Sequence, residues 1–253
     1  MAGLNNSNCS SSASVLVTRP VHQSSGFVDL LTDAGFTCVC LPTIKIEYIN
    51  ADLTDTLQSD LVIFTSVNAV TGASKSAKLP FNSRAKTASI GNATTQALED
   101  LNCNIDAAPH KGASSEALLE VLGDVENLQV TIVRGDTGRD ALRTALTERG
   151  ATVRYQTVYR RKLPAYTKTE IQTLLANGLP DVTSVTSDLG LTNLLALIPD
   201  DLKPALFTKP LVVNSKRCAE LARGNGFLGD ILVADPPGDE SQTGLISGLV
   251  FGK

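Results

Sequence analysis

The 253-residue sequence contains no tryptophan, only 4% aromatic residues and two histidines. So few aromatic side chains argue against the stacking platforms that bind single-stranded nucleic acids. With only His22 and His110, neither a histidine-based metal site nor a Ser-His-Asp triad is expected. The formal net charge of −4 argues further against non-specific nucleic-acid binding, but it still allows a local basic site.

Long apolar runs and targeting segments are missing as well. No apolar stretch approaches the roughly 20 residues of a membrane helix. Residues 1–13 are polar and rich in serine and asparagine, which predicts a disordered tail rather than a signal peptide. Five scattered cysteines suit reduced thiols, and we interpret Cys38 and Cys40, on one face of a predicted strand, as core packing. The protein is therefore expected to be cytoplasmic.

What is present is the composition of a globular protein, with 42% hydrophobic and 19% charged residues. The length is sufficient for two domains of ordinary size. Buried strands alternate with amphipathic helices along the chain, which predicts an α/β fold with parallel sheets. Residues 130–150 are typical, because a buried strand, a turn containing Arg134 and Gly135, and an amphipathic helix follow one another before Gly150.

An internal repeat divides the chain into two similar halves. Phe64-Thr-Ser66 is echoed by Val185-Thr-Ser187, and the turns Gly91-Asn92 and Asn214-Ser215 occupy equivalent places. We predict one discontinuous α/β domain, residues 14–44 with 164–253, and one continuous domain, residues 48–161. The segments 37–47 and 152–161 are predicted as long strands that turn amphipathic at their ends and pair as a two-stranded β linker.

Polar side chains recur at the predicted carboxyl ends of the strands, where open α/β sheets bind ligands. Arginines and free backbone N–H groups at such ends favour an anion, so the sequence predicts an anion site in the cleft between the domains. Each serine or threonine could instead be a helix cap, and an arginine could pair with Asp136 or Asp140. The candidate binding residues are Thr18, Arg19, Thr65, Ser66, Asn68, Gly91, Asn92, Thr94, Arg134, Gly135, Arg139, Thr186, Ser187 and Ser215.

Two tyrosines are candidates for a chemical role, and the sequence contains no nucleotide-binding motif. Tyr159 ends a predicted strand, where it is either a half-buried packing residue or a phenolic donor facing the cleft. Tyr166 lies next to a predicted helix cap. Neither a Walker loop nor a GxGxxG turn after a strand is present, so nucleotide cofactors have no support.

Several ordered motifs together resemble the uroporphyrinogen-III synthase family. They are VLVTRP at 15–20, FTSVNA at 64–69, IGNAT at 90–94, SEAL at 115–118, RGDTGR at 134–139 and Val158-Tyr159. Each motif is weak alone, but their order and spacing are fairly specific and cover nearly the whole chain after the tail. The chain departs from the family at Asn214-Ser-Lys-Arg217, where members usually repeat a Gly-x-x-Thr turn.

The resemblance implies two flavodoxin-like domains and a lyase that needs no cofactor or metal. The implied substrate is hydroxymethylbilane, a linear tetrapyrrole with eight carboxylates. It loses its terminal hydroxyl as water and closes, with ring D inverted through a spiro intermediate, to uroporphyrinogen III, which serves haem, sirohaem and cobalamin synthesis. Tyr159 matches the family tyrosine and would be the general acid, because a phenol is protonated at neutral pH.

The resemblance assigns roles to the other candidates as well. Ser66 and Thr94 would hydrogen-bond the substrate, while Arg19, Arg134 and Arg139 would neutralise its carboxylates. We expect a monomer with no nucleic-acid or membrane partner. The expected protein contact is a transient one with the enzyme that supplies the bilane. The alternative from another class is a non-catalytic two-lobed sensor of an anionic small molecule. The absence of a helix-turn-helix segment beyond the two lobes favours the enzyme.

Overall fold

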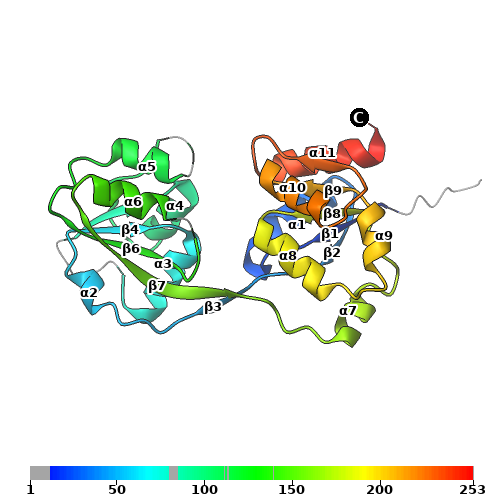
Figure 1. Cartoon of the computed structure of the whole chain (residues 1–253), viewed down its shortest axis with the longest axis horizontal. Coiled ribbons are helices and arrows are strands. Elements are labelled where there is room, and N and C mark those ends of the chain that lie inside the picture. The colour runs from blue at the N-terminus through cyan, green and yellow to red at the C-terminus, as the bar shows by residue number, and fades with distance from the viewer. Residues whose placement is uncertain (1–11, 80–84, 111, 113, 139, 253) are drawn as a thin grey trace, which may run out of the picture. The chain divides into compact units, whose positions relative to one another are not determined.

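The computed structural model describes residues 12–79, 85–110, 112, 114–138 and 140–252, and its contacts divide them into two compact units. Unit 1 holds the described residues up to Lys45 together with those from Leu163 onward, and unit 2 spans Ile46–Lys162. Each unit contains one five-stranded sheet with helices on both faces (Figure 1). The predicted α/β class with parallel sheets is confirmed.

Unit 1 has the sheet order β10-β9-β8-β1-β2, which is the flavodoxin-like order 2-1-3-4-5 when its strands are counted along the chain. Helices α1 and α11 cover one face, and α7, α8, α9 and α10 cover the other. The strands are β1 (Ser14–Val17), β2 (Thr37–Cys40), β8 (Val182–Val185), β9 (Leu211–Val213) and β10 (Ile231–Val233). The helices are η1 (Val21–Gln23, a 3-10 turn), α1 (Ser25–Asp33), α7 (Lys168–Leu174), α8 (Asp188–Leu197), α9 (Lys203–Thr208), α10 (Lys216–Gly224) and α11 (Asp239–Phe251).

Unit 2 has the sheet order β3-β7-β6-β4-β5. Helices α3 and α4 pack on one face, and α5 and α6 pack on the other, which buries apolar side chains on both sides of β4 and β6. The strands are β3 (Lys45–Tyr48), β4 (Leu61–Phe64), β5 (Lys86–Ser89), β6 (Gln129–Gly135) and β7 (Thr152–Lys162). The helices are α2 (Thr54–Leu57), α3 (Val67–Ser76), α4 (Asn92–Glu99), α5 (Ser115–Val121) and α6 (Ala141–Glu148).

The predicted repeat is visible in the topology. In unit 2, β4 and β5 occupy the places that β8 and β9 have in unit 1, and β6 and β7 occupy the places of β1 and β2. In the fifth place, the described residues of unit 2 form a single bridge, Ala88 to Ala107. The two units therefore share one strand order, but the strands that come first along the chain in unit 1 correspond to strands that come last in unit 2.

Residues 37–47 do not form the single long strand that the pattern predicted. β2 ends at Cys40 in the sheet of unit 1, and β3 begins at Lys45 in the sheet of unit 2. Pro42 cannot donate to a ladder, and the N–H of Thr43 instead donates to the carbonyl of Thr18 at 3.0 Å. The predicted pairing partner is nevertheless correct, because β3 lies beside β7.

Local capping signals predict the helix starts well. Thr167-Lys-Thr-Glu170 has the sequence of a capping box and forms one. The Glu170 N–H donates to Thr167 Oγ1 at 3.2 Å, and the Thr167 N–H donates to Glu170 Oε2 at 2.7 Å. Ser114 caps α5 by accepting from the Ala117 N–H. The last helix begins at Asp239, after Gly238, and has no side-chain cap.

The cysteines differ in environment although none forms a disulfide among the described residues. Cys103 and Cys218 are buried, and burial raises the pKa of the Cys218 thiol to about 11. Cys38 is half-buried, whereas Cys40 is exposed, so the prediction of core packing is wrong for Cys40. Over the part of the chain that the structure describes, none of the helices combines the length and apolar character of a membrane span.

Asp181 links the starts of β8 and β1. Its hydrogen bonds predict that the stability of the fold depends on pH. Its Oδ2 accepts from the Ser14 N–H at 2.9 Å and from Ser14 Oγ at 3.0 Å, and Lys209 Nζ lies 3.3 Å from Oδ1. The Ser14 backbone hydrogen bond is the main cause that lowers the pKa of Asp181 below its ordinary value of 3.8.

A carboxyl group with a lowered folded-state pKa stabilises the fold above its unfolded pKa, and this stabilisation is lost as the pH falls through the folded value. Asp181→Asn is therefore expected to reduce the free energy of unfolding at pH 7, and the difference from wild type should shrink below pH 3.8. Because the side chain is half exposed, the effect should stay under about 1 kcal/mol. Urea unfolding at pH 7 and pH 3 measures it, and a constant difference would contradict the assignment.

Candidate active site

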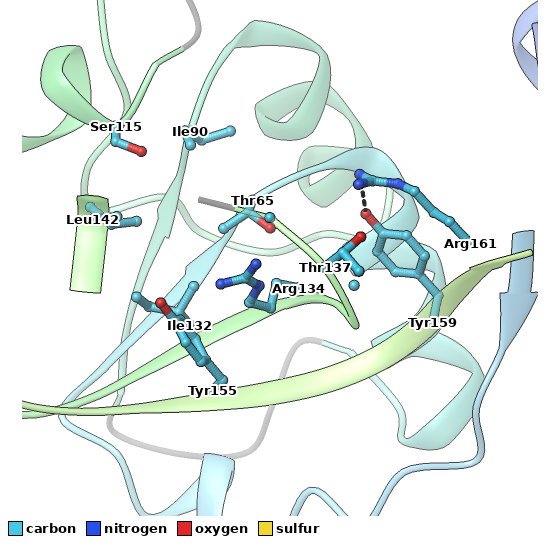
Figure 2. A pocket seen from close by; sticks show the side chains of 12 residues that line it. Thr65, Ile90, Ser115, Ile132, Arg134, Thr137, Leu142, Tyr155, Tyr159 and Arg161 are labelled. Carbon is cyan, nitrogen blue, oxygen red and sulfur yellow. Dashed lines mark hydrogen bonds between the residues drawn. The ribbon is translucent and has the colours of Figure 1, made fainter. Parts of the chain in front are cut away.

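A cavity of about 220 Å³ lies in unit 2 at the carboxyl ends of β4, β5 and β6 (Figure 2). β4 and β6 are neighbours from which the chain proceeds to opposite sides of the sheet, and such a switch point is where open α/β sheets bind ligands. The cavity is lined by Thr65, Ile90, Ser115, Ile132, Arg134, Gly135, Thr137, Gly138, Leu142, Tyr155, Tyr159 and Arg161.

Tyr159 has only 1% of its surface exposed, and its hydroxyl has two polar neighbours. Ser66 Oγ lies 3.2 Å away, and Arg161 Nη2 donates to the phenol oxygen at 3.1 Å (Figure 2). The ring belongs to the apolar cluster that packs against α3, which also contains Val158 and Phe64. The phenol is therefore held by a buried ring at one end and by hydrogen bonds at the cavity end.

A β-bulge in β7 decides where this ring points. Arg134 pairs with Thr157, but the next residue, Gly135, pairs with Tyr159, so one residue of β7 is extra. Regular alternation would place Tyr159 on the same face as Tyr155, which packs with the α5 and α6 cluster. Because of the bulge, Tyr159 joins Val158 in the cluster of α3 instead. The bulge thus turns the phenol towards Ser66.

Gly135 leaves the space that the phenol ring occupies. A Cβ at this position would lie 2.7 Å from Cζ and 3.0 Å from Oη of Tyr159. The backbone then closes around the ring, since the Asp136 N–H donates to the Tyr159 carbonyl at 3.0 Å. The glycine that the sequence singled out for ligand access therefore serves first to admit the tyrosine.

Arg134 contributes positive charge to the cavity. It is 8% exposed, its guanidinium lies 4.4 Å from the centre of the Tyr155 ring, and its Nη1 lies 3.4 Å from Asp140 Oδ1. Tyr155 Oη donates to the same carboxylate at 2.8 Å, and burial followed by this hydrogen bond raises the pKa of Tyr155. The anticipated pairing of an arginine with Asp140 is present, yet the guanidinium still lines the cavity.

The start of α3 supplies Thr65, Ser66 and Asn68. Thr65 lines the cavity and its hydroxyl donates to the Val133 carbonyl at 3.0 Å. Ser66 caps α3 by accepting from the Ala69 N–H at 3.1 Å, so it combines a cap with the contact to Tyr159. Asn68 is buried, and its Oδ1 accepts from Tyr48 Oη at 3.3 Å. It is not among the residues that line the cavity.

The IGNAT turn contributes less to this cavity than the sequence suggested. Ile90 lines it, whereas Gly91, Asn92 and Thr94 do not. Asn92 is exposed and Thr94 is buried. α4 begins after Gly91 without a side-chain cap, although the Thr94 N–H donates to the Gly91 carbonyl at 2.9 Å.

The candidate residues of unit 1 lie at the corresponding strand ends of its own sheet. Thr18 is buried and donates to the Ser184 carbonyl at 2.8 Å, and Thr186 is half-buried. Ser187 caps α8 and Ser215 caps α10, by accepting from the N–H groups of Gly190 and Cys218. The capping alternative is therefore observed for these two serines.

Arg19 is buried and already paired. Its Nη1 binds Asp239 at the start of α11, and its guanidinium lies 4.1 Å from the centre of the Phe27 ring. Its Nε and Nη2 are buried without a hydrogen-bond partner among the described residues. A role in neutralising a carboxylate stays a prediction, and it would require exchange of Asp239.

The turn that departs from the family pattern is tied to its own unit. Asn214 Oδ1 accepts from Gln242 Nε2 at 2.7 Å, and the Gln242 Oε1 accepts from Ser184 Oγ at 2.5 Å. Arg217 Nε lies 2.5 Å from Asp188 Oδ2. These contacts give Asn214 and Arg217 protein partners in place of a ligand.

Sequence reasoning missed Arg161, Thr137 and Tyr155 as cavity residues. Arg161 stands two positions after Tyr159 in the same strand, and the period of two was the signal that could have indicated it. Arg139, a predicted carboxylate ligand, lies outside the described residues. No cluster of three metal-binding side chains occurs within the described ranges.

Comparison with known proteins relates the fold and the site to a family. The family model described as uroporphyrinogen-III synthase HemD matches residues 25–242. The uroporphyrinogen-III synthase of Salmonella typhimurium is 32% identical over 238 residues, covering 88% of this chain and 95% of that protein. The Escherichia coli K12 enzyme of the same name is 30% identical over 239 residues, with the same two shares, 88% and 95%.

A solved structure agrees with the fold. The uroporphyrinogen-III synthetase of Helicobacter pylori has a TM-score of 0.65 and 18% identity, covering 94% of this chain and 99% of that one. At this identity the likeness supports the fold alone. The sequence matches over most of the chain confirm the resemblance, and the chain belongs to the uroporphyrinogen-III synthase family.

Proposed function

We propose that this chain converts hydroxymethylbilane to uroporphyrinogen III, with inversion of ring D and loss of water. The family supplies the reaction class, a lyase of tetrapyrrole biosynthesis. The structural observation that carries the proposal is the buried hydroxyl of Tyr159, which lies in a cavity that also contains the guanidinium groups of Arg134 and Arg161. A proton donor beside fixed positive charge suits a substrate with eight carboxylates.

In this mechanism Tyr159 donates its phenolic proton to the terminal hydroxyl of the bilane. The C–O bond breaks, water leaves, and the nitrogen of ring A stabilises the carbon that has become electrophilic. The substituted α-carbon of ring D then bonds to this carbon and forms the spiro intermediate. The bond between the same ring D carbon and the methylene bridge to ring C breaks, and the bridge carbon bonds to the free α-carbon of ring D, which inverts the ring. The ring carbon finally loses a proton, which restores the aromatic pyrrole and balances the phenolic proton donated at the start.

Because the bilane also closes without the protein, to the uninverted isomer, the protein must hold its two ends in the geometry that favours inversion. Correct orientation of reacting groups can contribute up to about 7–11 kcal/mol. A cavity of about 220 Å³ is smaller than the pockets of roughly 300–1,000 Å³ that hold drug-sized ligands, so it would enclose only the reacting end.

Carboxylates near the reacting end have several partners in unit 2. Arg134 would bind one of them by displacing Asp140, which is an exposed side chain and 3.4 Å away. The uncapped start of α4 offers backbone N–H groups to another, which gives Gly91, Asn92 and Thr94 their proposed place beside the substrate. The binding roles of Thr18, Arg19, Thr186, Ser187 and Ser215 in unit 1, and a substrate cleft between the domains, stay predictions.

We also propose that the chain acts as a cytoplasmic monomer that receives its unstable substrate from the enzyme that makes it. Light scattering of the purified protein measures whether the chain is a monomer. Light scattering of its mixture with that enzyme measures whether the two proteins bind. A stable dimer of the chain would contradict the first proposal.

The experiment that tests the function is a product analysis. The purified protein is incubated with freshly made hydroxymethylbilane, the products are oxidised, and the uroporphyrin isomers are separated by chromatography. We expect type III as the main product, with type I in the protein-free control. Type I alone in both samples would overturn the proposal and favour a non-catalytic sensor of an anionic small molecule.

A further inference from the structure

Arg161 holds the hydroxyl of Tyr159 from the side opposite its ring. Its Nη2 lies 3.1 Å from Tyr159 Oη, its Cζ lies 5.6 Å from the ring centre, and the side chain lines the cavity (Figure 2). No acidic side chain is paired with this guanidinium within the part of the chain that the structure describes. Its described polar contact is therefore the phenol itself.

This contact limits where the phenolic hydrogen can point. A guanidinium can only donate hydrogen bonds, so it occupies a lone pair of Tyr159 Oη and never competes for the hydrogen. The hydrogen is left for Ser66 Oγ, 3.2 Å away, or for a substrate oxygen in the cavity. Ser66 is itself fixed, because it accepts from the Ala69 N–H at 3.1 Å.

The backbone fixes Arg161 relative to Tyr159. The Arg161 N–H donates to Asp136 Oδ1 at 3.3 Å, while the Asp136 N–H donates to the Tyr159 carbonyl at 3.0 Å. The turn after β6 thus binds the main chain of β7 on both sides of Arg160. Arg161 and Tyr159 are two residues apart, so this clamp fixes the backbone positions from which both side chains extend.

Charge makes the contact stronger when the proton leaves. Once Tyr159 has donated its proton, its oxygen is a phenolate, so a hydrogen bond that the arginine charge already strengthens then also joins two opposite charges. The contact therefore stabilises the transition state more than the resting enzyme, which is the requirement for a rate effect.

We propose that Arg161 is the positioning residue of the general acid: it orients the Tyr159 hydroxyl towards the substrate and neutralises the phenolate left behind. This inference rests on the proposed role of Tyr159. The competing assignment for a cavity arginine is a direct partner of a substrate carboxylate. The two roles differ in what they do to kcat and KM and in their dependence on the Tyr159 hydroxyl.

The test compares Arg161→Met, Arg161→Lys, Tyr159→Phe and the double variant Tyr159→Phe/Arg161→Met by kcat and KM for type III product. Arg161→Met is expected to lower kcat by about tenfold to a hundredfold with KM within about twofold, the range of a lost charge-assisted hydrogen bond. Arg161→Lys should recover part of the loss, because it keeps the charge. In the double variant, kcat should equal that of Tyr159→Phe alone.

Arg160→Met is the matched control, since Arg160 is an exposed arginine of the same strand outside the cavity lining. This variant should behave as wild type.

Three outcomes overturn the inference. The first is a raised KM with kcat unchanged in Arg161→Met, which assigns the arginine to a substrate carboxylate. The second is an undiminished further loss of kcat in the double variant, which shows that Arg161 acts without the phenol. The third is a wild-type kcat in both Arg161 variants. A fully active Tyr159→Phe enzyme is a different result, because it removes the proposed acid before Arg161 is considered. Thermal melting confirms folding, and Arg161→Lys carries the test if the methionine variant does not fold.

Discussion

Tyr159→Phe is expected to lower kcat for type III product by about a hundredfold or more, the range of a positioned general acid. The substitution removes only the hydroxyl, so the ring still fills the cluster with Val158 and Phe64. The lost hydrogen bonds to Ser66 and Arg161 should cost roughly 0.5–1.5 kcal/mol each of folding stability. The variant should therefore be folded and nearly inactive.

The isomer ratio makes this result easy to read. A slow enzyme leaves bilane to close without help, so the share of type I should rise in the variant while the substrate disappears at close to its uncatalysed rate. Tyr166→Phe is the control, because Tyr166 is the other candidate tyrosine and lies in unit 1, away from the cavity lining. If Tyr159→Phe and Tyr166→Phe both keep wild-type kcat, Tyr159 is not the acid.

Gly135→Ala is expected to reduce kcat by at least about tenfold through the position of the same ring. The added Cβ would lie 2.7 Å from Cζ and 2.8 Å from Cε2 of Tyr159, distances that force the ring to move. The ring is 1% exposed and packed, so overpacking should also cost roughly 1–3 kcal/mol of stability. A displacement of about 1 Å can cost about a hundredfold in rate.

The measurement combines kcat with the free energy of unfolding in urea. Gly123→Ala is the matched control in the same unit, because Gly123 is exposed and a Cβ there meets nothing within 4 Å. It should match wild type in both measurements. A Gly135→Ala protein with wild-type kcat and stability would show that the ring is not held against the backbone at this position.

The sequence was sufficient for the fold class and for the two-part organisation of the chain, which rest on periodicity and on repeated order. The alternation of buried strands and amphipathic helices predicted the α/β class, and the echo of Phe64-Thr-Ser66 by Val185-Thr-Ser187 predicted two similar halves. Those predictions hold because each strand end and each cap is specified within a few residues, as at Thr167 and Glu170. The motifs and their order also pointed to the family that the sequence matches confirm.

The tertiary structure decided where one long pattern breaks. Residues 37–47 read as one strand, but two different sheets compete for them, and hydrogen bonding of Thr43 to Thr18 gives the first part to unit 1. Arg19 likewise read as a ligand for an anion. Only packing shows that Asp239, distant in the chain, and the Phe27 ring already surround it.

The arrangement around Tyr159 is also a product of tertiary structure. A period of two assigns it to the face of Tyr155, whereas the bulge opposite Gly135 moves it to the face of Val158. Its hydroxyl then meets Ser66, 93 residues away in the sequence, and Arg161. The identity of a residue is a local property, but a bulge depends on the register of two strands, so the partners of the tyrosine follow only from the folded sheet.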